Sequence, residues 1–114
     1  MKKYIYLFVL LVSPQANATF SCNVNINSVL VYASGAVNIL HSGRGDYTFI
    51  CNLKQDRLGV SITTCAMWTS MLTNIHNNKS KASFYYGGEG SCSTLPTYSA
   101  SPAPVYIGTE KTIY

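Results

Sequence analysis

Charged residues are scarce in this chain. Asp, Glu, Lys and Arg make up only 11% of it, and Lys and Arg form no cluster. The formal net charge is +4, and it falls to +2 if a leader carrying Lys2 and Lys3 is removed. Because nucleic acids are bound by concentrated positive charge, the composition argues against a nucleic-acid partner. The many Asn, Ser, Thr and Tyr residues favour neutral, hydroxyl-rich partners or other protein chains.

Catalytic and metal-binding motifs are also missing. The chain has no C-x-x-C, G-x-S-x-G or H-E-x-x-H motif. Its acids are Asp46, Asp56, Glu89 and Glu110, and its histidines are His41 and His76. None of these stands at a helical or metal-ligand spacing from another, so we expect no enzyme, no metal site and no cofactor. We expect His41 to be solvated at a strand end, and we interpret the Arg-Gly-Asp tripeptide at residues 44–46 as a chance match.

The first residues indicate a secretory leader. Two lysines precede an apolar run at residues 4–12, which is too short to span a bilayer, and a small-x-small cleavage site follows at residues 16–18. We therefore predict that residues 1–18 are a signal peptide and that the protein is secreted, exported through the bacterial periplasm. Residues 19–114, 96 of the 114 residues, would then form one domain. No later apolar segment is long enough to predict a membrane span.

All four cysteines follow the predicted cleavage site, at Cys22, Cys51, Cys65 and Cys92. An even number in a small exported chain indicates two disulfides, and four cysteines allow three pairings. We favour Cys51 with Cys65, because a short loop separates them between a strand end and a helix start. Cys22 then pairs with Cys92 by elimination.

The polarity pattern predicts a mainly β chain with one helix. Alternating or continuous apolar residues predict strands at residues 22–32, 36–41, 47–53, 80–86 and 105–107, and a helix at about residues 63–77. We expect a bulge near Ser28, and helix-capping oxygens from Ser61 or the threonines that follow it. Three strands, a helix and two strands is the order of a small OB-type Greek-key barrel. A different arrangement of the same elements stays open.

The predicted helix has one continuous apolar face. The spacings of three and four residues align Cys65, Trp68, Leu72 and Ile75. Met67 and Met71, four residues apart, widen this face on one side. Core packing alone explains such a stripe, and contact between the methionines and a neighbouring subunit is the second interpretation.

Binding residues are the best functional candidates. Saccharide sites combine an aromatic ring with hydroxyl, amide and cationic donors. Tyr32 and Ser34 supply a ring and a hydroxyl two residues apart at the end of a strand. The loop between the second and third cysteines and the start of the helix add Lys54, Arg57, Thr63 and Thr64. Such a set suits an acidic sugar such as a sialic acid.

The order of motifs resembles a toxin family. YASGAVNILHSG, then TFIC, a polar loop, TTCAMW and SFYYG, is similar to the B subunits of pertussis-like and subtilase-type AB toxins, including the delivery subunits of typhoid toxin. The shared features are a Ser-Gly strand end, a His-small-Gly turn, an aromatic-x-Cys strand, a Trp-bearing helix and a strand ending in Tyr-Tyr. The similarity covers residues 32–87, about half of the chain.

The resemblance implies a homopentameric ring of OB-fold subunits that binds sialylated host glycans and carries a separate enzymatic A subunit over its pore. It implies that the helix lines the pore, with Met67 and Met71 at subunit contacts. It also implies that Tyr32 and Ser34 bind the sialic acid, with Lys54 and Thr63 or Thr64 beside them. The C-terminal part instead resembles small secreted bacterial proteins, which supports an alternative, a monomeric exported binding or inhibitor module.

Overall fold

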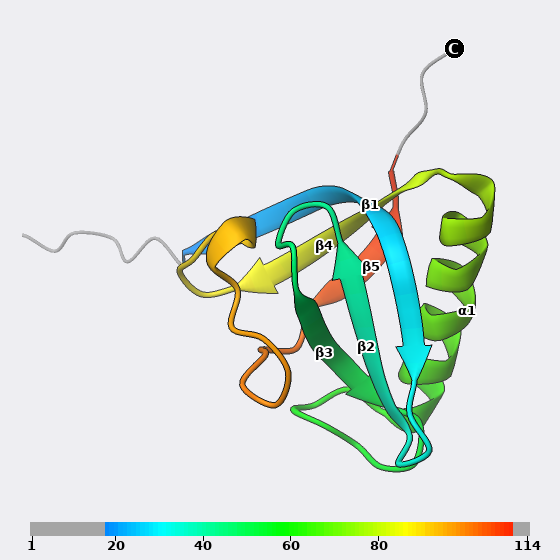
Figure 1. Cartoon of the computed structure of the whole chain (residues 1–114). Helices are drawn as coiled ribbons and strands as arrows, with labels where there is room; N and C mark the ends of the chain where they lie inside the picture. The colour runs from blue at the N-terminus through cyan, green and yellow to red at the C-terminus, as the bar shows by residue number, and fades with distance from the viewer. Residues whose placement is uncertain (1–17, 111–114) are drawn as a thin grey trace, which may run out of the picture.

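The computed structural model describes residues 18–110 (Figure 1). The elements are β1 (Thr19–Val31), β2 (Ala36–His41), β3 (Tyr47–Asn52), α1 (Ile62–Asn78), β4 (Lys81–Gly87), a short 3-10 helix η1 (Cys92–Thr94) and β5 (Tyr106–Thr109). The mainly β class with one helix is confirmed. Apart from Ala18, the predicted signal peptide lies outside the described residues, as does the end of the predicted domain. Within this range, no helix has the length and hydropathy that crossing a bilayer requires.

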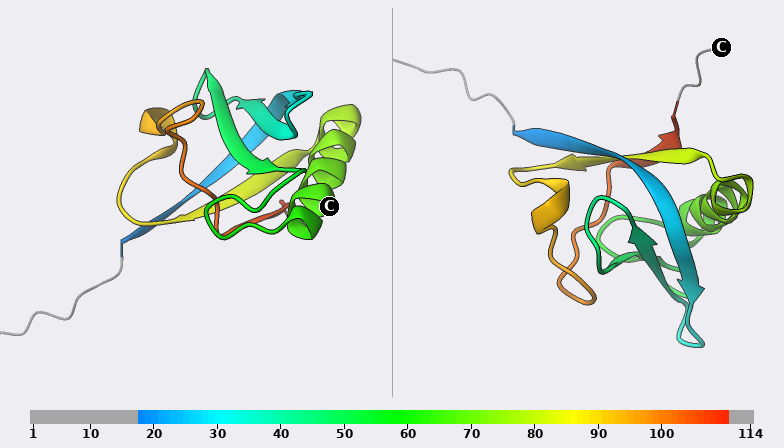
Figure 2. Two further views of the ribbon diagram at one scale, coloured as in Figure 1. Left: turned by 90° about the horizontal axis from the view of Figure 1, so that it is seen from below. Right: turned by 45° about the horizontal axis from the view of Figure 1, so that its top comes forward.

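The five strands form one antiparallel sheet in the order β3-β2-β1-β4-β5. The long strand β1 changes register between Ile26 and Ser28, which confirms the bulge predicted near Ser28. Its first half pairs with β4 and its second half pairs with β2. Figure 2 shows, in its right view, how β1 bends between these two pairings. The bend lets one sheet curl around a single core.

An irregular segment, residues 95–105, bridges the two edge strands β3 and β5. Ser101 Oγ accepts a hydrogen bond from Phe49 N of β3 at 3.0 Å. At the other end of the segment, Val105 N donates to Tyr85 O of β4 at 2.7 Å. The element order and the strand order are compatible with the predicted OB-type barrel, and this segment links β3 to β4.

Helix α1 packs its predicted apolar face on the sheet. The buried residues of the helix are Cys65, Trp68, Leu72 and Ile75, as the spacing predicted. Burying each large side chain contributes roughly 2 kcal/mol to stability. The helix begins after Ser61, whose Oγ accepts from Thr64 N at 3.1 Å, and ends at Lys79 in the left-handed conformation, with φ 55°. The serine cap relieves one of the unpaired amides of the first turn.

Both predicted disulfides are present. Cys51–Cys65 joins the end of β3 to the first turn of α1, and Cys22–Cys92 joins β1 to η1. The first closes a loop with a sequence separation of 14, and the second spans 70 residues. Together they link the helix and the C-terminal segment to the sheet.

The expectation that His41 is solvated is wrong, because the side chain is 0% exposed. Its ring lies 5.2 Å from the Phe84 ring, and its Nδ1 accepts a hydrogen bond from Gly43 N at 3.1 Å. That bond places the proton of the neutral ring on Nε2, which is buried without a hydrogen-bond partner among the described residues. Burial therefore lowers the pKa of His41 from 6.5 to about 4.

Candidate functional site

The β1–β2 turn (residues 32–35) carries the predicted ring and hydroxyl, and backbone contacts hold it firmly. Gly35 N donates to Tyr32 O at 2.8 Å, and Leu53 N, just after β3, donates to Gly35 O at 2.7 Å. Gly35 has φ +93°, and a Cβ there would lie 2.6 Å from Asn52 Oδ1. Glycine is required at this position because the turn passes so close to the end of β3.

Lys54 connects the loop between Cys51 and Cys65 to this turn. Its Nζ donates to Ala33 O at 2.8 Å, and its backbone N donates to Asn52 Oδ1 at 2.8 Å. An ammonium group has three donors, so two donors remain on Lys54 for a ligand. The structure thereby brings a cation from one loop to the turn formed by another.

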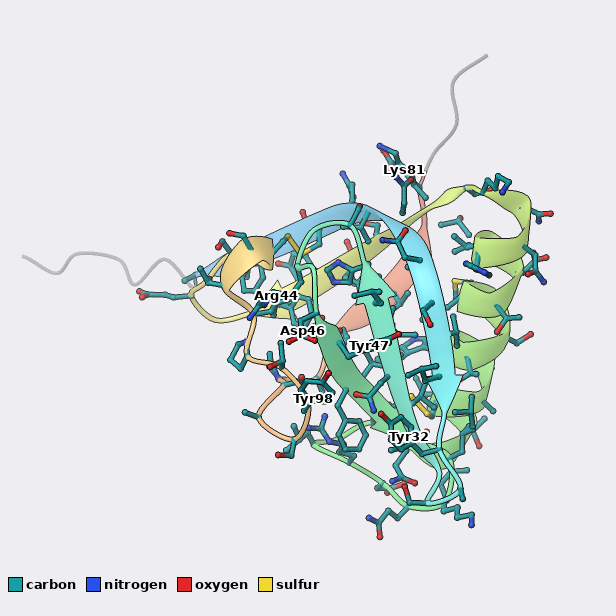
Figure 3. The ribbon with its side chains drawn as sticks, viewed as in Figure 1. Tyr32, Arg44, Asp46, Tyr47, Lys81 and Tyr98 are labelled. Atoms are coloured by element: carbon teal, nitrogen blue, oxygen red, sulfur yellow. A yellow bond between two sulfur atoms is a disulfide. The ribbon has the colours of Figure 1, made fainter. Side chains whose placement is uncertain are left out.

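The side chains of this turn face solvent. Tyr32 is 44% exposed, and Ser34 and Lys54 are also exposed. Figure 3 shows Tyr32 near the end of the molecule opposite Lys81, which is an exposed lysine at the start of β4. A ring, a hydroxyl and an ammonium group within one small surface can bind a ligand that has an apolar face, hydroxyls and a carboxylate.

The two threonines lie at the start of α1. Thr63 is exposed, whereas Thr64 is half-buried and its Oγ1 accepts a hydrogen bond from Ser61 Oγ at 3.1 Å. Thr64 also lines a shallow groove with Trp68 and residues 58–60 and 103–105. Within the described part of the chain, no hydrogen bond joins either threonine to the β1–β2 turn.

The two methionines differ in burial. Met67 is 66% exposed, and Met71 is partly buried against the core. Over its 17 residues, α1 contains no Asp, Glu, Lys or Arg. The solvent-facing side of the helix therefore carries no Asp, Glu, Lys or Arg, which is unusual for a helix exposed to water.

Arg57 has a structural role rather than a free charge. Its guanidinium lies 3.8 Å from the centroid of the Phe49 ring and donates to Phe49 O at 3.1 Å. It also donates to Ser101 O at 2.9 Å and to Ser99 O at 3.4 Å. These bonds hold the bridging segment against β3, which leaves Lys54 as the exposed cation of this loop.

The Arg-Gly-Asp tripeptide is occupied by internal contacts. Arg44 Nε donates to Leu95 O at 2.7 Å, while Asp46 Oδ1 accepts from Tyr47 N at 2.8 Å and from Tyr98 OH at 3.1 Å. Two side chains that hold their own loops are poorly placed to bind a receptor together.

An aromatic pair, Tyr47 and Tyr98, was not among the sequence candidates. The two ring centroids are 6.3 Å apart, and Tyr98 is 46% exposed. Figure 3 shows both tyrosines beside Asp46, on the side of the molecule where β2 and β3 face the viewer. Tyr98 comes from a segment with no periodicity. The one signal available in the sequence was that the residue is aromatic.

Within residues 18–110, no group of three or more His, Cys, Asp and Glu side chains could hold a metal ion. The candidate residues at the β1–β2 turn and in the loop after Cys51 offer an aromatic ring, hydroxyls and one exposed cation. Comparison with family models, curated proteins and solved structures found no match to this chain.

Proposed function

We propose that this chain is the glycan-binding delivery subunit of a secreted bacterial AB-type toxin. In this proposal a homopentameric ring binds sialylated glycans on host cells and carries a separate enzymatic A subunit. The proposal combines the resemblance described above with one observation, the assembly of Tyr32, Ser34 and Lys54 at the β1–β2 turn.

The chemistry of a terminal sialic acid fits this turn. Its carboxylate would pair with the ammonium of Lys54, and its hydroxyls would bond to Ser34, which is exposed and follows Ala33, the residue whose carbonyl accepts from Lys54. The ring of Tyr32 would cover the apolar part of the sugar. Backbone contacts hold the turn before a ligand binds, so little conformational freedom would be lost on binding.

The proposed pentameric ring is supported by the residue composition of α1. A helix with no charged residue and an exposed Met67 is better suited to contact with neighbouring subunits than to water. The two disulfides are compatible with export, as is the absence of a candidate membrane-spanning helix within residues 18–110. The alternative is a monomeric exported binding or inhibitor module, supported by the divergent C-terminal segment.

Glycan-array binding tests the first part of the proposal. The protein should be retained on sialylated glycans. Lys54→Gln should reduce that binding at least about tenfold, because it removes a charged hydrogen bond, and Ser34→Ala should reduce it about threefold or more, because it removes a neutral one. Lys81→Gln is the matched control, because it removes one exposed lysine far from Tyr32 (Figure 3). Absence of any sialoglycan signal from the folded protein would reject this function.

Light scattering coupled to size exclusion tests the ring. The expected mass is that of five chains, and Met67→Lys should yield monomers because it places a charge in the subunit contact. Ser93→Lys on η1, which adds the same charge on the side of the molecule opposite α1 in Figure 1, should leave the pentamer intact. A monomer at micromolar concentration would favour the alternative module.

A further inference from the structure

A second candidate surface lies on the outer face of β3 and is built from residues other than those of the β1–β2 turn. The rings of Tyr47 and Tyr98 meet at an angle of 41°, so neither ring covers the other. Tyr47 OH donates to Ser28 Oγ at 3.3 Å, across the neighbouring strand β2. Two rings held at this angle, one of them half exposed, offer an aromatic surface on which the C–H face of a sugar can lie.

The carboxylate of Asp46 lies at the edge of this aromatic pair. Its Oδ1 is occupied by Tyr47 N and Tyr98 OH. Among the residues that the structure describes, no hydrogen bond or ion pair involves Oδ2 of this side chain. The pKa of the Tyr98 phenol is raised, first by its hydrogen bond to Asp46 and then by desolvation. The charges of Asp46, Tyr32 and Tyr47 raise it further.

The pair is held in position by its backbone. Tyr98 adopts the left-handed conformation, with φ 53°, which is uncommon for a residue with a bulky side chain. An isolated bridge to Thr48 fixes it, and Tyr98 N donates to Tyr47 O at 3.1 Å. Backbone strain of this kind persists where the surroundings over-determine it, and it is frequent at ligand sites.

We propose that Tyr98, Tyr47 and Asp46 form a subsite for a neutral hexopyranose. The C–H face of the sugar would lie on the Tyr98 ring and against the edge of Tyr47, and a pair of its hydroxyls would donate to Asp46 Oδ2. The negative charge of Asp46 selects against an acidic sugar here, whereas Lys54 at the β1–β2 turn selects for one. The inference extends the proposed glycan binding to separate residues, and it does not depend on the toxin assignment.

Backbone-amide NMR titration of the exported protein tests this subsite. The ligands are methyl glycosides of galactose, glucose, mannose and N-acetylglucosamine, with sialyllactose in a parallel titration. At least one neutral glycoside should shift the amides of residues 46–49 and 98–101 and show saturation transfer from tyrosine protons. In the parallel titration, sialyllactose should shift the amides of residues 32–35 at lower concentrations than those of residues 46–49 and 98–101.

Three variants locate the binding. Tyr98→Asn removes the ring with a residue that tolerates the left-handed conformation, and Asp46→Asn replaces Oδ2 while its remaining oxygen can keep both internal bonds. Each should weaken neutral-glycoside binding at least about fivefold, since a stacked ring or a charged acceptor contributes that much. Tyr106→Asn is the control, because Tyr106 is 50% exposed but lies on β5, at the other edge of the sheet.

The outcomes separate this subsite from the proposed sialic-acid site. Neutral-glycoside shifts that disappear in Tyr98→Asn and persist in Ser34→Ala support the subsite. Shifts confined to residues 32–35 overturn it and leave the sialoglycan function standing. No shift at residues 46–49 and 98–101 with any neutral glycoside, or shifts unchanged in Tyr98→Asn, also overturn it.

Discussion

Acidification should destabilise this protein between the ordinary pKa of histidine, 6.5, and the lowered pKa of His41, about 4. Burial lowers the pKa of His41 from 6.5 to about 4, so the unfolded chain takes up a proton before the native protein does as the pH falls. The stability that the neutral His41 ring contributes is fully present above the unfolded-state pKa of 6.5. It is lost progressively as the pH falls toward the native-state value.

The two pKa values set the size of the effect. The difference between 6.5 and about 4 corresponds to a total loss of about 3 kcal/mol in the free energy of unfolding, of which about 2 kcal/mol is lost by roughly pH 5. Most carboxylates of an unfolded chain titrate below that pH, at about 4, so the loss near pH 5 belongs mainly to histidine. The free energy of unfolding of a small domain is about 5–15 kcal/mol in total, so this loss is a large part of it.

Urea unfolding at several pH values, followed by the fluorescence of Trp68, measures this loss. In His41→Gln the side-chain amide oxygen can still accept from Gly43 N, and nothing at that position titrates. The variant should be less stable at neutral pH and should lose little further stability near pH 5. His76→Gln removes the other histidine, whose Nδ1 bonds to Ile26 O at 2.8 Å, and comparing the two variants separates the contributions of the two residues.

Two results would refute the reasoning. One is an NMR titration of the His41 ring with a midpoint near its ordinary value of 6.5. The other is an unchanged loss of stability in His41→Gln, which would assign the pH dependence to other groups.

Three further substitutions test the supports of the candidate surfaces. Gly35→Ala should cost at least about 2 kcal/mol by urea unfolding and weaken sialoglycan binding, whereas Gly45→Ala, also at positive φ but with open space around it, should cost only about 1 kcal/mol; equal costs would contradict the close approach at Gly35. Arg57→Lys should cost about 2 kcal/mol, because lysine lacks the planar fork that reaches three carbonyls over Phe49, and a loss below about 0.5 kcal/mol would dismiss that role. Removing the Cys51–Cys65 bridge by serine substitution at both positions should cost about 3 kcal/mol in chain entropy, and an unchanged urea midpoint would contradict it.

Periodic segments were predictable because one local rule governs each of them. The apolar stripe of α1 placed its four buried residues correctly, and its bounds were predicted to within one residue at each end. The break in alternation near Ser28 marked the bulge that bends β1. Short separation along the chain identified Cys51 with Cys65, and the other pair followed. The helix, the bulge and the first disulfide needed only residues close in sequence, and the second disulfide followed by elimination.

The features that failed or were missed depend on contacts between distant segments. His41 ends a strand and precedes a glycine turn, which reads as solvent-exposed. In the fold, that turn is pressed against β1 and η1, since a Cβ on Gly43 would lie 2.8 Å from Val24 Cγ1 and 3.3 Å from Cys92 Cβ. Tyr98 lies among prolines where no period exists, and in the fold it adopts the left-handed conformation and bridges to Thr48 of β3. Sequence patterns carry no such information.

The loop between Cys51 and Cys65 gives the two candidate surfaces a common support. Lys54 reaches the turn that carries Tyr32, and Arg57 reaches the carbonyls of the segment that carries Tyr98. A loop tied at both ends by a disulfide has fewer conformations, so both contacts are made by a preorganised element. The bridge that stabilises this small domain thereby also restrains the loop that contacts both candidate surfaces.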